Sequence, residues 1–151
     1  MTTEMRVATS DMRMARECGR VLLVAGLCVG ICERALELSV EYAKTRVQFG
    51  KPIGSFQMVQ ALLAEMYTDT EAMKSLVWRT LADVNDLEIG GGGRGQAHKL
   101  TAASILFAGE ACNRVLNKAV QVHGGSGYIW ESEINRLFRC IKILEIGAGT
   151  S

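Results

Sequence analysis

Three long segments of this chain carry apolar residues at spacings of three, four and seven, and glycine-rich breaks separate them. This periodicity gathers apolar side chains on one face of an α-helix. The only proline, Pro52, lies in a break, so no proline interrupts the segments themselves. The pattern predicts three long helices and one short one, over residues 11–46, 56–86, 96–122 and 132–144. In the first of them, the predicted core-facing stripe consists of Leu23, Leu27, Ile31, Leu38 and Tyr42.

Short breaks between long helices favour antiparallel neighbours, so we predict an all-α, up-down four-helix bundle. The chain has 151 residues, which suits a single domain. Its aromatic content of 6% favours helices over sheets. Residues 1–10 are polar and unpatterned. We expect them to form a frayed or disordered tail ahead of a bundle over residues 11–151.

The charge and the cysteines argue against several functional classes. The formal net charge is +1, so no strong field attracts nucleic acid. The longest apolar run, residues 21–32, is shorter than the ~20 residues that span a bilayer, and no secretory signal precedes it. The five cysteines show no disulfide framework, and no histidine or cysteine pair has the spacing of a zinc site. We therefore expect reduced thiols, no metal, and a reducing compartment such as the cytoplasm or the mitochondrial matrix.

Two of the breaks combine glycines with groups that can hold an anion. Residues 46–57 begin with Arg46, and an arginine fork suits a phosphate group. Residues 121–128 contain Gly124 and Gly125, and successive amides in a glycine-rich turn can bind an anion. The residues alone leave ordinary alternatives open: an arginine that is favourable to the helix dipole, and a plain helix cap followed by a turn.

Taken together, three segments resemble the C-terminal domain of the acyl-CoA dehydrogenase family. They are residues 35–54 (ALELSVEYAKTRVQFGKPIG), 121–128 (QVHGGSGY) and 144–151 (LEIGAGTS), in the family's order and at about its separations. The resemblance covers residues 17–151 and implies an enzyme that holds FAD between its domains and assembles as a homo-oligomer. By that resemblance, the residues that contact FAD are Arg46, Gln48, Phe49, Phe56, Gln57, Gln121, Gly124, Gly125 and Thr150.

The resemblance also implies the reaction. A carboxylate removes the α-proton of an acyl-CoA thioester, and the β-hydrogen leaves as hydride to the flavin, which gives an enoyl-CoA. Arg46 would lie near the pyrophosphate, while Gln121, Gly124 and Gly125 would contact the FAD of a neighbouring subunit. The family's N-terminal helical and middle β domains, in the same polypeptide or in a partner subunit, would complete the site. We therefore expect this chain to be inactive alone.

The catalytic base is the point at which the chain departs from the family. Many members carry it as a glutamate where this chain has Ala148. The Gly-Ala-Gly-Thr-Ser form is similar to the isovaleryl-CoA dehydrogenase branch, whose base comes from the first helix, at a position that falls on Gly19 or Arg20 here. Neither residue is acidic, so the nearest carboxylate, Glu17, becomes the candidate base. The alternative is a catalytically inactive helical module for oligomerisation, and we expect no counterpart of the family's final helix.

Overall fold

The computed structural model describes residues 3–86 and 95–147, with side chains described for residues 18–84 and 95–147. Its helices are α1 (Thr3–Thr45), α2 (Gln57–Asp86), α3 (Gln96–His123), α4 (Gly125–Tyr128) and α5 (Glu133–Gly147). Between α1 and α2 lie the strands β1 (Val47–Gln48) and β2 (Lys51–Pro52) and the 3-10 turn η1 (Ile53–Ser55). The two strands pair antiparallel, with Val47 opposite Pro52 and Gln48 opposite Lys51.

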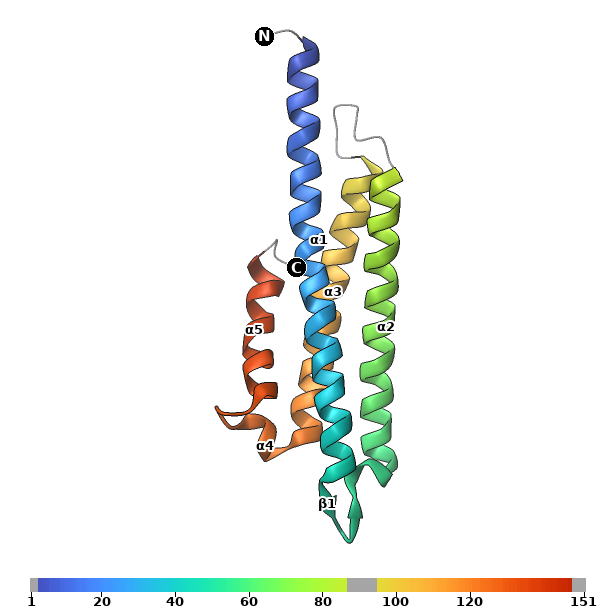
Figure 1. Cartoon of the computed structure of the whole chain (residues 1–151), viewed down its shortest axis with the longest axis vertical. Coiled ribbons are helices and arrows are strands. Elements are labelled where there is room, and N and C mark those ends of the chain that lie inside the picture. The colour runs from blue at the N-terminus through green and yellow to red at the C-terminus, as the bar shows by residue number, and fades with distance from the viewer. Residues whose placement is uncertain (1–2, 87–94, 148–151) are drawn as a thin grey trace.

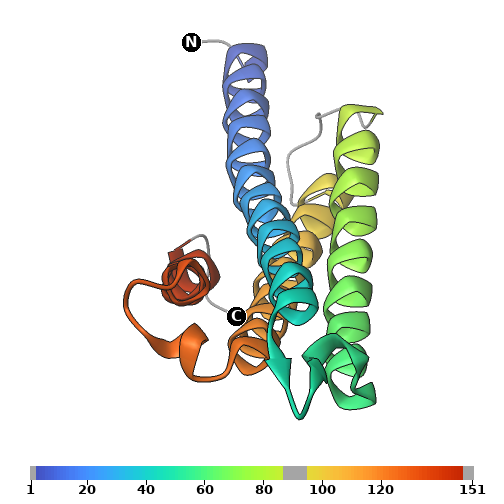
Figure 2. The same cartoon turned by 60° about the horizontal axis from the view of Figure 1, so that its bottom comes forward.

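The long helices α1, α2 and α3 lie side by side and alternate in direction, and α5 packs against α3 and α1 (Figures 1 and 2). The β1–β2 hairpin and α4 both lie at the lower end of the bundle in Figure 1. The prediction of an all-α antiparallel bundle is confirmed. Within the described residues, no helix combines the length and the apolar character that crossing a membrane would require.

The first helix begins earlier than the apolar pattern predicted. We expected a frayed tail over residues 1–10 and a helix from Asp11, but the backbone is helical from Thr3. Residues 3–16 contain no glycine or proline, so no residue among them breaks a helix. Methionine, arginine, alanine and glutamate in this stretch are strong helix formers. Intrinsic propensity therefore extends α1 past the point where its apolar face ends.

The face of α1 that packs into the bundle is not the predicted stripe. Leu23 is 71% exposed and Leu27 is 56% exposed, while Ile31 and Leu38 pack only partly against the core. The buried residues of α1 are mostly small and include Cys18, Leu22, Ala25, Cys28, Val29, Cys32 and Ala35. The stripe prediction was wrong because it followed the largest apolar side chains. The separation of two packed helices depends on the side chains at their contact, so small residues allow α1 to approach α3 closely.

The cysteines serve this close packing as small core residues. Cys28 and Cys32 on α1 and Cys112 on α3 are each fully buried. The Cys112 thiol donates to the carbonyl oxygen of Cys28 across the helix contact, with a sulfur-to-oxygen distance of 3.6 Å. The structure has all five cysteines as free thiols, with Cys140 the exposed one.

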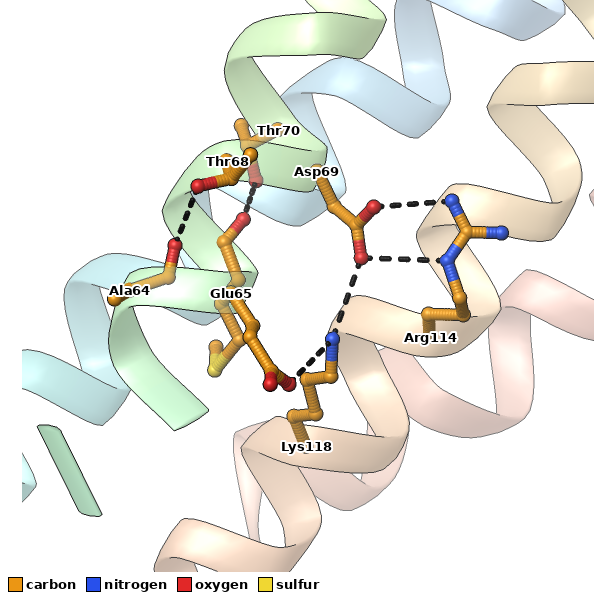
Figure 3. Close-up of polar contacts among 8 residues, drawn as sticks. Ala64, Glu65, Thr68, Asp69, Thr70, Arg114 and Lys118 are labelled. Carbon is orange, nitrogen blue, oxygen red and sulfur yellow. Dashed lines mark hydrogen bonds and ion pairs between the residues drawn. The ribbon is translucent and has the colours of Figure 1, made fainter. Parts of the chain in front are cut away.

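The carboxylate of Asp69 on α2 forms ion pairs with two cations on α3, Arg114 and Lys118 (Figure 3). Arg114 donates from Nε and Nη2 to the two carboxylate oxygens of Asp69, at 3.3 and 3.0 Å, and Lys118 Nζ lies 3.4 Å from Asp69. Lys118 also pairs with Glu65 at 3.1 Å. Burial tends to raise the pKa of Asp69, but the two cations outweigh it and hold that pKa below its usual range.

Replacing Asp69 by asparagine is expected to lower the free energy of unfolding by about 1.5–3 kcal/mol, the usual contribution of hydrogen bonds to charged groups. Because the folded-state pKa of Asp69 is depressed, its stabilisation is complete above the unfolded-state pKa and is lost as pH falls through the folded-state pKa. The difference in free energy of unfolding between variant and wild type should therefore shrink as the pH falls. Urea unfolding at several pH values from about 7 to about 2 measures it.

The matched control is Asp83→Asn on the same helix. Asp83 pairs with Arg79, and their side chains are 41% and 76% exposed. An exposed pair contributes under about 1 kcal/mol, so this variant should change the unfolding free energy little. A difference between Asp69→Asn and wild type that did not depend on pH would contradict the role assigned to the Asp69 carboxylate.

Candidate functional site

The break after α1 forms a defined hairpin. The Arg46 amide donates to the carbonyl oxygen of Tyr42 at 2.8 Å, which continues the last turn of α1, and the Ile53 amide donates to the carbonyl oxygen of Arg46 at 2.8 Å. At the tip, Phe49 and Gly50 have φ angles of 51° and 78°. Glycine adopts this left-handed conformation readily, and phenylalanine does so at a cost. The hairpin thus leaves Phe49 92% exposed.

The segment that follows the hairpin tip is braced against α1. A Cβ atom on Gly54 would lie 3.1 Å from the carbonyl oxygen of Ala43, so the backbone approaches α1 closely there. The ring of Phe56 meets Phe49 edge-on, with centroids 6.2 Å apart, and Lys51 Nζ lies 4.5 Å from the Phe56 centroid. Two aromatic rings and a lysine therefore gather on the segment that follows Arg46.

The break after α3 is a tight turn that requires glycine. Gly124 has a φ of 56° and its amide donates to the carbonyl oxygen of Gln121 at 3.2 Å. A Cβ atom on Gly127 would lie 2.8 Å from the Cβ of His123, closer than two carbons can pack. A Cβ on Gly124 or Gly125, by contrast, would meet nothing within 4 Å. This turn leaves open space beside backbone amides, as a phosphate site requires.

One side chain connects the hairpin to the glycine turn. Tyr42 lies one helical turn before Arg46, and its ring stacks on His123 with centroids 4.4 Å apart and an interplanar angle of 25°. Its hydroxyl donates to Ser126 Oγ at 3.3 Å. The two breaks therefore lie at the same end of the bundle, as Figure 2 also shows with that end turned forward.

The predicted cofactor residues other than Thr150 lie in these two breaks or at the helix ends beside them. Those with exposed side chains or backbone are Arg46, Gln48, Phe49, Gln57, Gln121, Gly124 and Gly125, and Phe56 is half-buried. Thr150 and Ala148 lie outside the described residues. The link through Tyr42 was not predicted from the sequence, because Tyr42 was expected in the core stripe. Its position four residues before Arg46 was the available signal.

An apolar groove of about 1020 Å³ lies on another part of the bundle, lined by residues of α1, α2 and α5. Its walls include Leu23 and Leu27 from α1, Trp78 from α2 and Leu137 from α5. Gly19 also lines it, and a Cβ atom there would meet nothing within 4 Å. This groove was not predicted from the sequence, because Leu23 and Leu27 were expected in the core.

The carboxylates that line the groove are engaged in ion pairs. Glu33 pairs with Lys74 at 2.9 Å, and Glu133 pairs with Arg34 at 3.0 Å, which holds the pKa of Glu133 below its usual range. A carboxylate in an ion pair is stabilised in its ionised form by its partner, so it is a weak base and poorly suited to abstract a proton. Glu17 lies in α1, and its side chain is outside the described residues, so its role as base stays a prediction.

Comparison with known proteins places this geometry in a family. The family model described as "Acyl-CoA dehydrogenase, C-terminal domain" matches residues 5–151. The chain is 41% identical over 135 residues to the probable acyl-CoA dehydrogenase YngJ of Bacillus subtilis, which covers 88% of this chain and 33% of that protein. It is 40% identical to the mitochondrial isovaleryl-CoA dehydrogenase of Oryza sativa subsp. japonica, over 87% of this chain and 30% of that protein.

The solved structures agree with the sequence comparison. Butyryl-CoA dehydrogenase from Megasphaera elsdenii is 35% identical, with a TM-score of 0.80 over 89% of this chain and 33% of that one. The chain thus spans about a third of the length of the relatives it matches. The family match takes in the Arg46 hairpin, the Gly124 turn and, from residue 5 onward, the helices of the described residues. The chain belongs to the acyl-CoA dehydrogenase family and has the fold of that family's C-terminal domain.

Proposed function

We propose that this chain forms part of the FAD site of a flavin-dependent acyl-CoA dehydrogenase, an enzyme that oxidises an acyl-CoA to an enoyl-CoA. The observation that carries the proposal is the pairing of the Arg46 hairpin with the Gly124 turn at one end of the bundle. Because of this pairing we assign both breaks to one FAD, whereas the resemblance implied that the Gly124 turn contacts the FAD of a neighbouring subunit. An arginine fork and a glycine turn with open space beside its backbone are complementary to a dianionic pyrophosphate. FAD, when bound, accepts the hydride that leaves the β-carbon of the substrate.

The electrostatics of the hairpin support an anionic ligand. Lys44, on the last turn of α1, is paired with Glu41 at 2.7 Å. Among the described side chains, Arg46 has no ion-pair partner. Lys51 lies over the Phe56 ring rather than beside a carboxylate. Two cations of the hairpin are therefore available to a phosphate, and the open space at Gly124 and Gly125 admits one close to the backbone.

The apolar groove supports a site that is completed by further protein. Leu23 is 71% exposed and Trp78 is 64% exposed, and contiguous apolar surface of this kind usually marks an interaction site. In the proposed enzyme the N-terminal and middle domains, or a second subunit, cover this surface and complete the acyl-CoA pocket. Glu17 on α1 is the proposed base that removes the α-proton of the thioester.

Arg46→Gln tests the cofactor site. In the assembled enzyme, with its N-terminal and middle domains present, the variant is expected to bind FAD about 10- to 100-fold more weakly. That loss corresponds to the ~1.5–3 kcal/mol of a charge-assisted hydrogen bond. Flavin fluorescence during titration of the apoenzyme measures the dissociation constant. The control Arg79→Gln removes an arginine from the exposed surface of α2, where it pairs with Asp83, and should leave FAD affinity unchanged.

A second candidate function is a catalytically inactive oligomerisation module derived from the same family. Ala148 in place of the usual glutamate base favours it. The same titration separates the two. An assembled protein that bound no FAD and turned over no acyl-CoA would support the module, whereas stoichiometric FAD and reduction of an artificial electron acceptor would support the enzyme. Equal FAD affinity in Arg46→Gln and wild type would contradict the site proposed here.

A further inference from the structure

We propose that Tyr42 is a positioning residue that holds the Arg46 hairpin and the Gly124 turn in a fixed relation before the cofactor binds. This inference rests on the proposed function, because it takes the two breaks to be the two arms of one FAD site. It adds a role for a side chain that belongs to neither arm. Tyr42 makes contacts of both kinds, two through its main-chain carbonyl oxygen and two through its side chain.

The main chain of Tyr42 anchors the hairpin. Its carbonyl oxygen accepts from the Arg46 amide at 2.8 Å and from the Thr45 hydroxyl at 3.4 Å. The hydrogen bond from the Ile53 amide to the Arg46 carbonyl then closes the hairpin on the same point. The position of Arg46, directly after α1, is therefore fixed by its hydrogen bond to Tyr42 in the last helical turn.

The side chain of Tyr42 anchors the glycine turn. Its ring covers the His123 ring at 4.4 Å, and its hydroxyl donates to Ser126 Oγ at 3.3 Å. His123 is fixed from its other side, because Nδ1 lies 2.9 Å from the carbonyl oxygen of Ala119. The backbone of Gly127 packs on the Cβ of His123 so closely that no side chain fits there. Contacts thus run without interruption from α1 through α3 to α4.

The alternatives for this cluster explain less of the geometry. A tyrosine used only as core filling needs no partner for its hydroxyl other than water, yet Tyr42 directs its hydroxyl at the middle of the turn. The surrounding residues Ser126, Gly124 and Gly125 are exposed, so the cluster lies at the edge of the bundle rather than in its core. A pair of loops that is already ordered loses less entropy when a ligand binds between them, which raises affinity.

Three variants separate the contribution of the Tyr42 ring from that of its hydroxyl. Tyr42→Phe keeps the stacked ring and removes the hydroxyl, whereas Tyr42→Leu removes both. Tyr67→Leu is the control, because Tyr67 is a 57% exposed tyrosine within α2 that belongs to neither loop. In the assembled enzyme we expect Tyr42→Leu to weaken FAD binding about 10-fold, and Tyr42→Phe to restore most of that loss. Tyr67→Leu should match wild type.

A second readout uses the 151-residue chain without cofactor and does not depend on FAD. Burial lowers the pKa of His123 below its usual value, although the hydrogen bond with Ala119 opposes this. Removal of the covering ring in Tyr42→Leu should raise that pKa in an NMR titration and speed amide exchange at both Arg46 and Gly127. Tyr42→Phe should leave the His123 pKa low. A role limited to general stability would not move the two loops selectively.

The outcomes are distinct for the two proposals. If wild type binds no FAD, the proposed function fails, and the His123 titration and the amide exchange still decide whether Tyr42 couples the loops. If Tyr42→Leu leaves the His123 pKa and both amides unchanged, or binds FAD as Tyr67→Leu does, the positioning role is overturned. Should Tyr42→Leu not fold, His123→Leu takes its place, because it removes the stacked ring from the other side. Faster exchange is then expected at Gly127, and unchanged exchange overturns the proposal.

Discussion

Replacing Glu17 by glutamine is expected to lower the turnover of the assembled enzyme about 10²- to 10⁴-fold, the usual contribution of a positioned general base. Glutamine has nearly the same shape but accepts no proton at neutral pH, so FAD content and folding should stay unchanged. The assay is reduction of an artificial electron acceptor with saturating acyl-CoA. Full activity in Glu17→Gln would remove Glu17 from the mechanism.

Adding Gly19→Glu to the Glu17→Gln variant tests whether the base must lie at this end of the groove. Gly19 lines the apolar groove, and a Cβ atom there meets nothing within 4 Å, so a longer side chain fits. Introduced into Glu17→Gln, the new carboxylate should restore part of the turnover, because it enters the groove directly. A matched control is Gly30→Glu, which lines the same groove further along α1, with equally open space. Equal recovery at Gly19 and Gly30 would show that any groove carboxylate suffices.

Leu116→Ala is expected to lower the free energy of unfolding by about 2–5 kcal/mol, the largest loss of stability we predict for a single substitution in this chain. Leu116 has no exposed surface and belongs to the core that α3 shares with its neighbours. Its truncation leaves a cavity whose walls cannot fully collapse, so lost contacts add to the lost burial. Urea denaturation of the full chain, followed by circular dichroism, measures the change.

The control for this substitution lies on the same helix. Leu106 is 50% exposed, so Leu106→Ala removes a similar number of atoms with little loss of burial and should cost under about 1 kcal/mol. The two variants share their effect on helix propensity, so the difference between them reports burial alone. Similar losses for Leu106→Ala and Leu116→Ala would contradict the assigned core.

Local rules predicted much of this fold. The apolar spacing predicted the long helices α2 and α3, and the glycine stretches predicted where the helices end. Both predictions were possible because both signals act within a few residues. The face that α1 buries was not predictable in the same way. That face depends on how closely α3 approaches, and small residues such as Ala25 and Cys28 carry a weaker hydrophobic signal than Leu23.

In the candidate site, too, local features could be predicted from the sequence and contacts between distant residues could not. Arg46 and Gly124 could be selected from the sequence because each has a local chemical meaning, a phosphate-binding fork and a turn with positive φ. Their link through Tyr42 could not, because it joins residues of helices that are distant in sequence. The groove was missed for a related reason: it exists only where α2 and α5 leave part of α1 uncovered.

The continuous course of α1, from Thr3 to Thr45, sets a limit on how one molecule can contribute to catalysis. At about 1.5 Å per residue, the backbone positions of Gly19 and Arg46 are separated by about 40 Å along the axis. A flavin's reactive ring is joined to its diphosphate by a short ribityl chain, far too short for that separation. If both proposals hold, a complete reaction centre combines opposite ends of α1 from different copies, so that a single copy serves two centres and completes neither.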